Sequence, residues 1–129
     1  MMASTTSINS DNPPAVVGSF SQAIKLSKLV FMPGHLPIDP ATGDIIVGNI
    51  KEQTRQALIN LKEILAAAGS SLENVVKARV FMTNIADFRE VSQVYEEFFP
   101  RQAPPVLSCV EVPKLAKGAK VEIEAIVLW

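Results

Sequence analysis

Hydrophobic and polar residues alternate in several stretches of this chain, which is the pattern of β-strands that cover a core with one face. The last stretch, Lys120–Leu128, shows the pattern most clearly, because every second residue is apolar: Val121, Ile123, Ala125 and Val127. The opposite face mixes carboxylates with larger apolar side chains: Glu122, Glu124, Ile126 and Leu128. A face of this kind is too apolar for free solvent and too charged for a core, so it predicts a subunit contact or a ligand site.

Four further segments are predicted to be strands: Val16–Leu26, Leu29–Met32, Val75–Met82 and Val106–Val112. In the third of these, alternation directs one set of apolar residues toward the core: Val76, Ala78, Val80 and Met82. In the fourth, we expect Leu107, Cys109 and Glu111 to lie on the same mixed face as Glu122.

Two helices interrupt the series of strands. Asn49 and Glu52 have the spacing of a capping box, so the first helix is expected to begin near Asn49, and Gly69 is expected to end it. The second is expected to begin at Asp87 and to reach Phe99. Apolar residues follow the helical period in both: Ile50, Ala57, Leu58, Leu61, Ile64, Leu65 and Ala68 in the first, and Val91, Val94, Tyr95 and Phe98 in the second.

The order strand, strand, helix, strand, helix, strand, strand predicts an α+β fold, in which one sheet is covered on one face by two helices. Two helices cannot cover both faces of such a sheet, so the mixed face is left open in a single subunit. Symmetric self-association would bury this face, and we therefore expect a homo-oligomer.

The length of 129 residues, with 48% hydrophobic and 19% charged residues, is typical of one globular domain. We expect residues 1–12 to form a flexible polar tail and residues 13–129 to form the domain. A net charge of -1, without any basic segment, argues against a nucleic-acid partner. No apolar run approaches the roughly 20 residues of a membrane helix, so no membrane partner is expected. Residues 1–12 lack the arginines of a mitochondrial presequence, and a cytoplasmic location is expected.

The single histidine, His35, is a first candidate for chemistry. Pro33 and Gly34 are expected to end the preceding strand, which leaves His35 in a turn. It is either a surface residue there or a proton donor or acceptor beside the sheet face. A metal site is not expected, because one histidine and one cysteine without paired spacing do not make a ligand set.

Cys109 and Glu122 are the other candidates. Cys109 is either a half-buried structural thiol or a nucleophile, although no activating base lies near it in the sequence. Glu122 and its neighbour Glu124 either lie on a solvated strand edge or form ion pairs between subunits with Lys77 and Arg79. Alternatively, one of them has a raised pKa and holds a water or moves a proton in a partly apolar interface pocket.

Four segments together resemble the RidA (YjgF) family of reactive-intermediate deaminases: VVGSFSQAIKL, LVFMPGHLPIDPATG, VVKARVFMTNIADFREVSQVYEEFFP and LSCVEVPKLAKGAKVEIEAI. The similarity extends from about Pro13 to Leu128. It implies a chorismate-mutase-like fold and a homotrimer with pockets between its subunits. It also implies a small-molecule substrate, namely a 2-imino or enamine acid that is hydrolysed to a 2-keto acid and ammonia, without a metal or an organic cofactor.

Position by position, the resemblance implies that Glu122 holds the attacking water. The substrate-binding residues would be Phe20, Gly34, Phe88, Ser92, Leu107 and Cys109. Several positions depart from the family pattern: Phe20 stands for a tyrosine, Ser92 for an asparagine, and Pro33-Gly34-His35 for a Ser-Gly-Gln turn. The largest departure is Leu107, which stands where an arginine grips the substrate carboxylate. Loss of such a bidentate contact costs about 1.5–3 kcal/mol, or tenfold to several hundredfold in binding.

Three functions are compatible with these residues. In the first, the chain is an imine deaminase for a substrate without a carboxylate, using Glu122 and a backbone amide near Gly34. Alternatively, its pocket serves another reaction, such as an isomerisation, condensation or cyclisation of a less charged molecule in specialised metabolism, with His35 and Glu122 as acid and base. Or the oligomer binds a ligand or protein without catalysis. The retained glutamate and the new histidine favour an enzyme, and the departures favour a diverged reaction.

Overall fold

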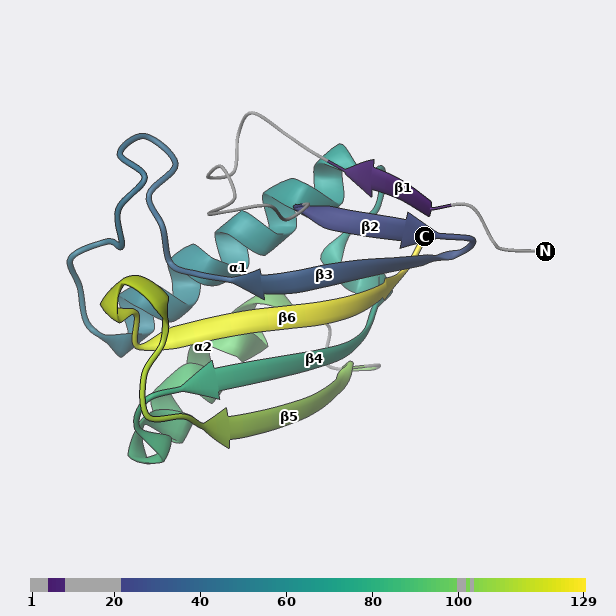
Figure 1. Cartoon of the computed structure of the whole chain (residues 1–129). Coiled ribbons are helices and arrows are strands. Elements are labelled where there is room, and N and C mark those ends of the chain that lie inside the picture. Colours follow the sequence, from purple (N-terminus) through teal and green to yellow (C-terminus); the bar gives the residue numbers. More distant parts are fainter. Residues whose placement is uncertain (1–4, 9–21, 100–101, 103) are drawn as a thin grey trace.

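The computed structural model describes residues 5–8, 22–99, 102 and 104–129, which form a six-stranded sheet with two helices on one face (Figure 1). The predicted α+β class is confirmed. The strands are β1 (Thr5–Ile8), β2 (Ala23–Leu26), β3 (Leu29–His35), β4 (Val75–Met82), β5 (Val106–Glu111) and β6 (Val121–Leu128). The helices are α1 (Ile50–Ala67) and α2 (Phe88–Phe98), and short 3-10 helices occur at Leu72–Asn74, Ile85–Asp87 and Ala116–Gly118.

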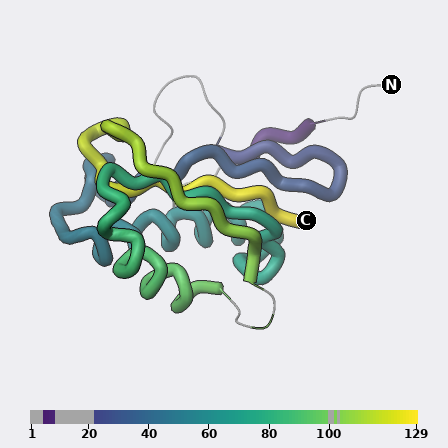
Figure 2. The backbone as a smooth tube through the Cα atoms, turned by 90° about the horizontal axis from the view of Figure 1, so that it is seen from below, coloured from purple at the N-terminus to yellow at the C-terminus, as the bar shows by residue number. Residues whose placement is uncertain are grey.

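The last strand of the chain lies in the middle of the sheet. The strand order is β1-β2-β3-β6-β4-β5, so β6 pairs with both β3 and β4. Neighbouring strands are antiparallel except β4 and β5, which run parallel because α2 provides the crossover between them. Seen from below, the sheet forms one layer and the helices the other (Figure 2). No helix among the described residues is long and apolar enough to cross a membrane.

The core fills the space between the sheet and the helices. Its fully buried members include much of the predicted stripes of both helices and most of the predicted apolar face of β6: Leu58, Leu61, Ile64, Leu65, Val91, Val94, Val121, Ile123 and Val127. Ile50, Ala68 and Phe98, also predicted for the stripes, are only partly buried. Each such side chain contributes about 1.5–3 kcal/mol of burial free energy. The expected start of α1 is also confirmed, because the Glu52 backbone N–H donates to Asn49 Oδ1 over 2.9 Å. Asn49 N–H reaches back to Glu52 Oε1 over 3.5 Å, which completes the capping box.

Two buried amides of α1, which the apolar pattern did not predict, hold the chain at the ends of β3 and β6. Asn60 Nδ2 donates to the backbone oxygens of Leu36 and Ile38, over 3.0 and 2.9 Å. Gln53 Oε1 accepts from the backbone N–H of Lys120 over 2.9 Å. Because buried polar groups need partners, these bonds fix the chain beyond β3 and before β6 in place.

A β-bulge in β3 overturns the expected position of His35. Met32 pairs with Ala125 and His35 pairs with Ile123, so three steps along β3 match two along β6. The strand therefore continues through Pro33 to His35 and does not end in a turn. The extra residue also returns the His35 side chain to the face that the helices cover.

A second bulge in β4 corrects the predicted inward face of that strand. Val75 pairs with Val127 and Lys77 with Ile126, so Val76 is the extra residue. Val75 is therefore buried, while Val76, which was expected to face inward, is 50% exposed. The other predicted inward residues of β4 are buried: Ala78, Val80 and Met82.

The N-terminal part of the chain also differs from expectation. Residues 5–8, expected to belong to a flexible tail, form β1 and pair antiparallel with β2. Polar side chains are compatible with this position, because an edge strand needs only backbone pairing with one neighbour. Of the predicted strand Val16–Leu26, residues 23–26 form β2, and residues 16–21, including Phe20, lie outside the described residues. The boundary at residue 13 stays a prediction.

Candidate active site

The open face, by which we mean the side of the sheet that the helices do not cover, carries its side chains in rows across the strands. Cross-strand partners point to the same side of a sheet, so the pairing defines each row. The first, the apolar row, runs through Ile24, Phe31, Ile126, Lys77 and Val106. The second, the ion-pair row, contains Glu124, Arg79 and Ser108. The third, the Glu122 row, contains Glu122, Phe81 and Val110.

Glu122 lies between Phe81 on one side and the backbone of Gly34 on the other. A Cβ atom at residue 34 would overlap Glu122 Oε1, so only glycine leaves room for the carboxylate here. Burial of this half-buried group, and secondly the negative charge of Glu124, raise the pKa of Glu122 above its ordinary value of 4.5. A carboxylate that binds a proton more readily than usual is suited to take a proton from water and return it.

Arg79 pairs with Glu124 within the chain, in the row next to Glu122. Arg79 Nη1 and Glu124 Oε1 are 3.3 Å apart, and their side chains are 41% and 37% exposed. A pair this exposed contributes little to stability. Its consequence is electrostatic, because the guanidinium offsets part of the Glu124 charge that acts on Glu122. The ion pair thus joins β4 and β6 within one chain, whereas the sequence suggested ion pairs between subunits, which stay a prediction.

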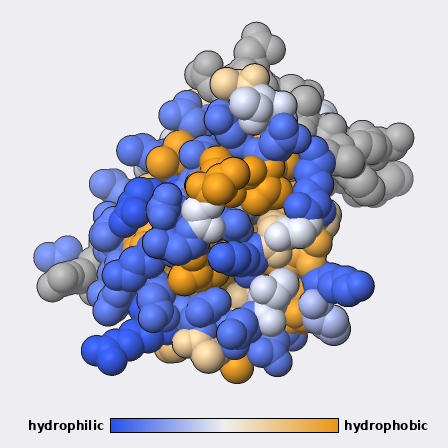
Figure 3. Space-filling view, turned by 90° about the vertical axis from the view of Figure 1, so that its left-hand side faces the viewer, coloured by the Kyte–Doolittle hydropathy of each residue, from blue (hydrophilic) through white to orange (hydrophobic). Residues whose placement is uncertain are grey.

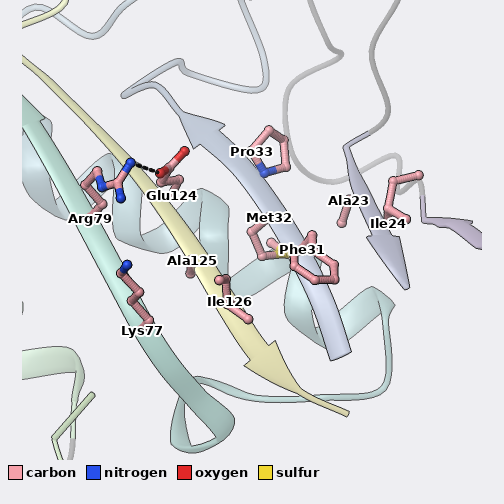
Figure 4. Close-up of a pocket in the computed structure, with 10 residues that line it drawn as sticks. All are labelled: Ala23, Ile24, Phe31, Met32, Pro33, Lys77, Arg79, Glu124, Ala125 and Ile126. Atoms are coloured by element: carbon pink, nitrogen blue, oxygen red, sulfur yellow. Dashed lines mark ion pairs between the residues drawn. The ribbon is translucent and has the colours of Figure 1, made fainter. Parts of the chain in front are cut away.

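A pocket of about 540 Å³ opens on this face, beside the Glu122 row (Figure 4). Lys77, Arg79 and Glu124 are its charged residues, and Figure 4 shows Arg79 reaching toward Glu124 across β6. The other lining residues are apolar: Ala23, Ile24, Phe31, Met32, Pro33, Ala125 and Ile126. The sequence predicts Lys77 and Arg79 only as ion-pair partners. The signal for a pocket was their alternation with buried residues along one strand, which places two cations on the same face.

His35 does not face this pocket. It lies on the helix-covered face, 9% exposed, opposite the fully buried Ile123. Its Nδ1 is 2.8 Å from the Pro33 carbonyl oxygen, and because a carbonyl can only accept, Nδ1 carries the proton. Burial lowers the pKa of His35, although the bond to Pro33 opposes the effect, so the imidazole is neutral near pH 7. The interpretation of His35 as an acid or base on the open face is wrong for this subunit.

Leu107 and Cys109 also lie on the helix-covered face, which corrects the expectation that they share a face with Glu122. The parallel pairing aligns Leu107 with Ala78 and Cys109 with Val80, both of which are buried against the helices. Both pack partly buried against the core. Burial raises the pKa of the Cys109 thiol, so it stays protonated and agrees with a structural role rather than with a nucleophile.

The remaining expected substrate-binding residues lie on α2, along one stripe of that helix. Phe88, Ser92 and Tyr95 are spaced by four and three residues and therefore share a face. Burial, and secondly the nearby Cys109 of β5, raise the pKa of the Tyr95 hydroxyl. That hydroxyl is buried without a hydrogen-bond partner among the residues described. Phe88 is 47% exposed at the start of the helix and Ser92 is partly exposed.

The expected site is thus divided between the two sides of one sheet. Gly34 and Glu122 lie on the open face. Leu107 and Cys109 lie on the other side of the edge strand, and Phe88 and Ser92 lie on α2. Phe20 lies outside the described residues. Within one subunit these two groups do not meet.

Large apolar side chains are exposed on the open face at its margins. Leu29 and Leu128 pair with each other beyond the apolar row and are 36% and 49% exposed, while Val106 and Val110 on the edge strand are 64% and 40% exposed. By contrast, the end of the molecule to which the strand β3 points is largely hydrophilic, with separate apolar patches (Figure 3). The open face therefore presents apolar surface that a further subunit would favourably cover.

Acidic, histidine and cysteine side chains do not gather into a cluster that could hold a metal ion anywhere in the described ranges. The absence of a cofactor stays a prediction.

Comparison with known proteins agrees with this fold. The sequence profile of the family described as "Endoribonuclease L-PSP" matches residues 10–129. A RutC family protein of Pyrococcus horikoshii is 46% identical over 119 residues, which cover 92% of this chain and 94% of that protein. The 2-iminobutanoate/2-iminopropanoate deaminase of Bos taurus is 41% identical over 119 residues, which cover 92% of this chain and 86% of that enzyme.

A solved structure is also similar to this chain. RidA from the Antarctic bacterium Psychrobacter sp. PAMC 21119 superposes with a TM-score of 0.92 at 38% identity, covering 96% of this chain and 99% of that one. Family profile, sequence relatives and solved structure all span nearly the whole chain. The chain therefore belongs to the endoribonuclease L-PSP family, which is the family of the RidA (YjgF) proteins.

Proposed function

We propose that this protein hydrolyses a small imine or enamine to a carbonyl compound and ammonia, with Glu122 as the group that moves the protons. The observation that carries the proposal is the half-buried carboxylate of Glu122, whose pKa is raised and which lies against Gly34. The bovine relative, named for deamination of 2-iminobutanoate and 2-iminopropanoate, supports the same reaction class.

The raised pKa of Glu122 suits both halves of an imine hydrolysis. The carboxylate takes a proton from water as the water oxygen bonds to the imine carbon, which gives a carbinolamine. The resulting carboxylic acid gives this proton to the nitrogen, which leaves a neutral carbinolamine. The carboxylate then takes the hydroxyl proton and passes it to the same nitrogen, the C=O bond forms as the C–N bond breaks, and ammonia leaves. One water is consumed and the glutamate ends in its starting state.

The alternative reaction, in which His35 and Glu122 act as acid and base, lacks one of its two catalytic groups at this site. It required His35 beside Glu122, but His35 is neutral and buried on the helix-covered face. Hydrolysis needs only one proton carrier and is therefore the better supported reaction.

Leu107 affects which substrate is expected to bind, and not the reaction that is proposed. A leucine offers no charge to a carboxylate next to the reacting carbon, where the family resemblance expects an arginine. We therefore propose an imine whose reacting carbon carries no carboxylate, or whose charge lies elsewhere in the molecule.

The site is proposed to be completed between subunits of a homotrimer. Glu122 and Leu107 lie on opposite sides of the sheet, so a second copy must supply one of the two groups if they act on the same molecule. The exposed apolar residues of the open face favour such packing: Leu29, Val106, Val110 and Leu128.

The test is ammonia release from imines generated in situ by an oxidase. 2-Iminopropanoate and a neutral aldimine are compared, with Glu122→Gln and, as matched control, Glu96→Gln on the exposed side of α2. We expect acceleration over the spontaneous rate, a preference for the neutral imine, and loss only in Glu122→Gln. No acceleration of either imine would refute the proposed reaction, and full activity of Glu122→Gln would refute the proposed role.

A further inference from the structure

We propose that Arg79 is a counter-ion shared by Glu122 and Glu124, and that it serves the proposed reaction as a positioning residue. It pairs with Glu124 alone while Glu122 holds a proton, and it bridges both carboxylates when Glu122 is ionised. This role deepens the proposed function and rests on it for its meaning, but the counter-ion can be tested without the hydrolysis of any imine.

Four residues of β4 and β6 form a compact block on the open face. Glu124 stands opposite Arg79, and Glu122 stands opposite Phe81, in two adjacent rows. Arg79 and Glu122 are therefore diagonal neighbours, a relation in which two residues lie about 7–8 Å apart and a long side chain reaches across. The Arg79 side chain is thus long enough to contact either carboxylate.

The contact with Glu124 uses a small part of the hydrogen-bonding capacity of Arg79. It joins Arg79 Nη1 to Glu124 Oε1 over 3.3 Å (Figure 4). Arg79 Cζ also lies 6.0 Å from the ring centroid of Phe81, the residue opposite Glu122, so the guanidinium is near the Glu122 row as well. A guanidinium has five N–H donors in a planar fork, so Arg79 can bind a second carboxylate while it keeps the first.

The charges of the two carboxylates favour a shared cation. Glu122 and Glu124 lie two residues apart on the same face of β6, so ionisation of both places two like charges close together. Burial, and secondly the charge of Glu124, raise the pKa of Glu122. A cation that contacts both groups reduces their repulsion. Arg79 therefore favours the ionised form of Glu122, which is the form that takes a proton from water in the proposed reaction.

Other charged groups lie farther from Glu122. Lys77 is two residues beyond Arg79 on β4, opposite a position four residues from Glu122, which corresponds to roughly 13 Å along a strand. Beside Glu122 itself, β3 contributes Gly34 and β5 contributes Val110, neither of which is charged. By register, Arg79 is therefore the cation nearest to Glu122 among the described residues.

The shared counter-ion is built within one chain, so it does not depend on an exposed face. A neighbouring copy that covers the open face would exclude water from these side chains, and charges interact more strongly where water is excluded. The alternative is that Arg79 turns away from Glu122 and pairs with a carboxylate of the neighbouring copy. The two cases differ in the effect that Arg79 has on the protonation of Glu122.

The test is an NMR titration of the Glu122 carboxyl carbon in the native assembly, with the signal identified by its loss in Glu122→Gln. Arg79→Met should raise the titration midpoint by about half a pH unit, which corresponds to one exposed ion pair, and Arg79→Lys should raise it less. Glu124→Gln should lower the midpoint. The matched control is Arg55→Met, which should have no effect, because Arg55 forms a similarly exposed pair with Glu97 between the helices.

A double variant separates a shared counter-ion from a fixed partner of Glu124. When Glu124→Gln is in place, a shared Arg79 contacts Glu122 alone. Adding Arg79→Met should then raise the midpoint at least as much as it does in the wild-type background. The absence of a shift in the wild-type background would overturn the proposal, and so would a smaller shift in the Glu124→Gln background.

Sedimentation of each variant accounts for changes in assembly. Dissociation alone would expose Glu122 to water and lower its midpoint, so a rise in Arg79→Met supports the proposal in either state of assembly. A fall that accompanies dissociation would show that Arg79 holds a neighbouring copy instead, and the proposal would be wrong.

The kinetics of ammonia release separate this proposal from the proposed reaction. The acid limb of kcat/KM should move to higher pH in Arg79→Met and to lower pH in Glu124→Gln, together with the midpoint. An acid limb that stays fixed while the midpoint moves would overturn the positioning role. If the midpoint moves as expected but no imine is hydrolysed, the proposed reaction is wrong and the shared counter-ion is supported.

Discussion

The carboxylate of Glu122 occupies the space that a side chain at residue 34 would need. Gly34 belongs to the bulged part of β3 and Glu122 to β6, so the contact joins the two central strands on the open face. Gly34 therefore has a role that does not depend on backbone flexibility. Because it has no Cβ, the Glu122 carboxylate has room to lie against the sheet.

Gly34→Ala is therefore expected to displace the Glu122 carboxylate. The added methyl group should destabilise the fold by about 1–3 kcal/mol, as in other overpacked sites, and reduce imine hydrolysis at least tenfold. Urea denaturation and the ammonia assay measure the two effects. In a Glu122→Ala background the clash is absent, so the stability cost should largely vanish. A cost that is unchanged in that background would show that the overlap with Glu122 is not its cause.

The stability of the protein should depend on pH through Glu122. Its pKa is raised in the folded protein, so the folded state binds the proton more tightly than the unfolded state does. Stability is then lost as the pH rises from 4.5 through the raised pKa. Glu122→Gln removes this loss, and its stability relative to wild type should increase between pH 4 and pH 7. Denaturation at several pH values measures the trend, and a constant difference would contradict it.

Leu107→Arg should restore recognition of a carboxylate. The guanidinium can form a bidentate pair, so kcat/KM for 2-iminopropanoate should rise at least about tenfold, with little change for a neutral imine. Leu107→Met is the control for side-chain length without charge. Equal rates for both variants would mean that residue 107 does not contact the substrate.

Mixed subunits can test whether the site is shared. Glu122→Gln disables the part of the proposed site that contains Glu122, and Leu107→Trp blocks the part that contains Leu107. Each variant alone should be inactive. When the two are unfolded and refolded together, random trimers should regain about a quarter of the wild-type activity, because some seams combine two intact halves. A mixture as inactive as its components would place both halves in one subunit or remove residue 107 from the site.

Asn60 should be a strong determinant of stability. Asn60→Ala leaves the carbonyls of Leu36 and Ile38 without their donor and should cost about 2–4 kcal/mol. Asn74→Ala, which removes a single exposed bond to Ser70, should cost less than about 1 kcal/mol. Denaturant unfolding measures both. Similar costs would mean that the loop beyond β3 is held by other contacts.

Local signals in the sequence predicted much of this fold. The capping box of Asn49 and Glu52 placed the start of α1, and the alternation in Val121–Leu128 divided β6 into its two faces. Both signals lie within a few residues, where spacing alone decides the geometry. The same alternation placed Glu122 on the open face.

The predictions that were wrong depended on the pairing and register between strands, and the periodicity within one strand gives no information on either. The faces of β5 were correctly separated, but only pairing with β4 decides that Leu107 lies with Ala78 toward the helices. The bulges in β3 and β4 each shift one register by a single residue, which moved His35 and Val76 to the faces opposite to those expected. The contact between Gly34 and Glu122 likewise joins segments that are distant in sequence.

Because of the bulge in β3, the number of residues in this strand, and not only their identity, decides which side chains face Glu122. If the pairing of Met32 with Ala125 continued in regular register, His35 would stand opposite Glu122 on the open face. The imidazole is kept apart from the carboxylate only by one extra position in the strand. An insertion or deletion at Pro33–Gly34 would therefore be a direct evolutionary route to a different set of reactive groups, one that a comparison of substitutions alone would miss.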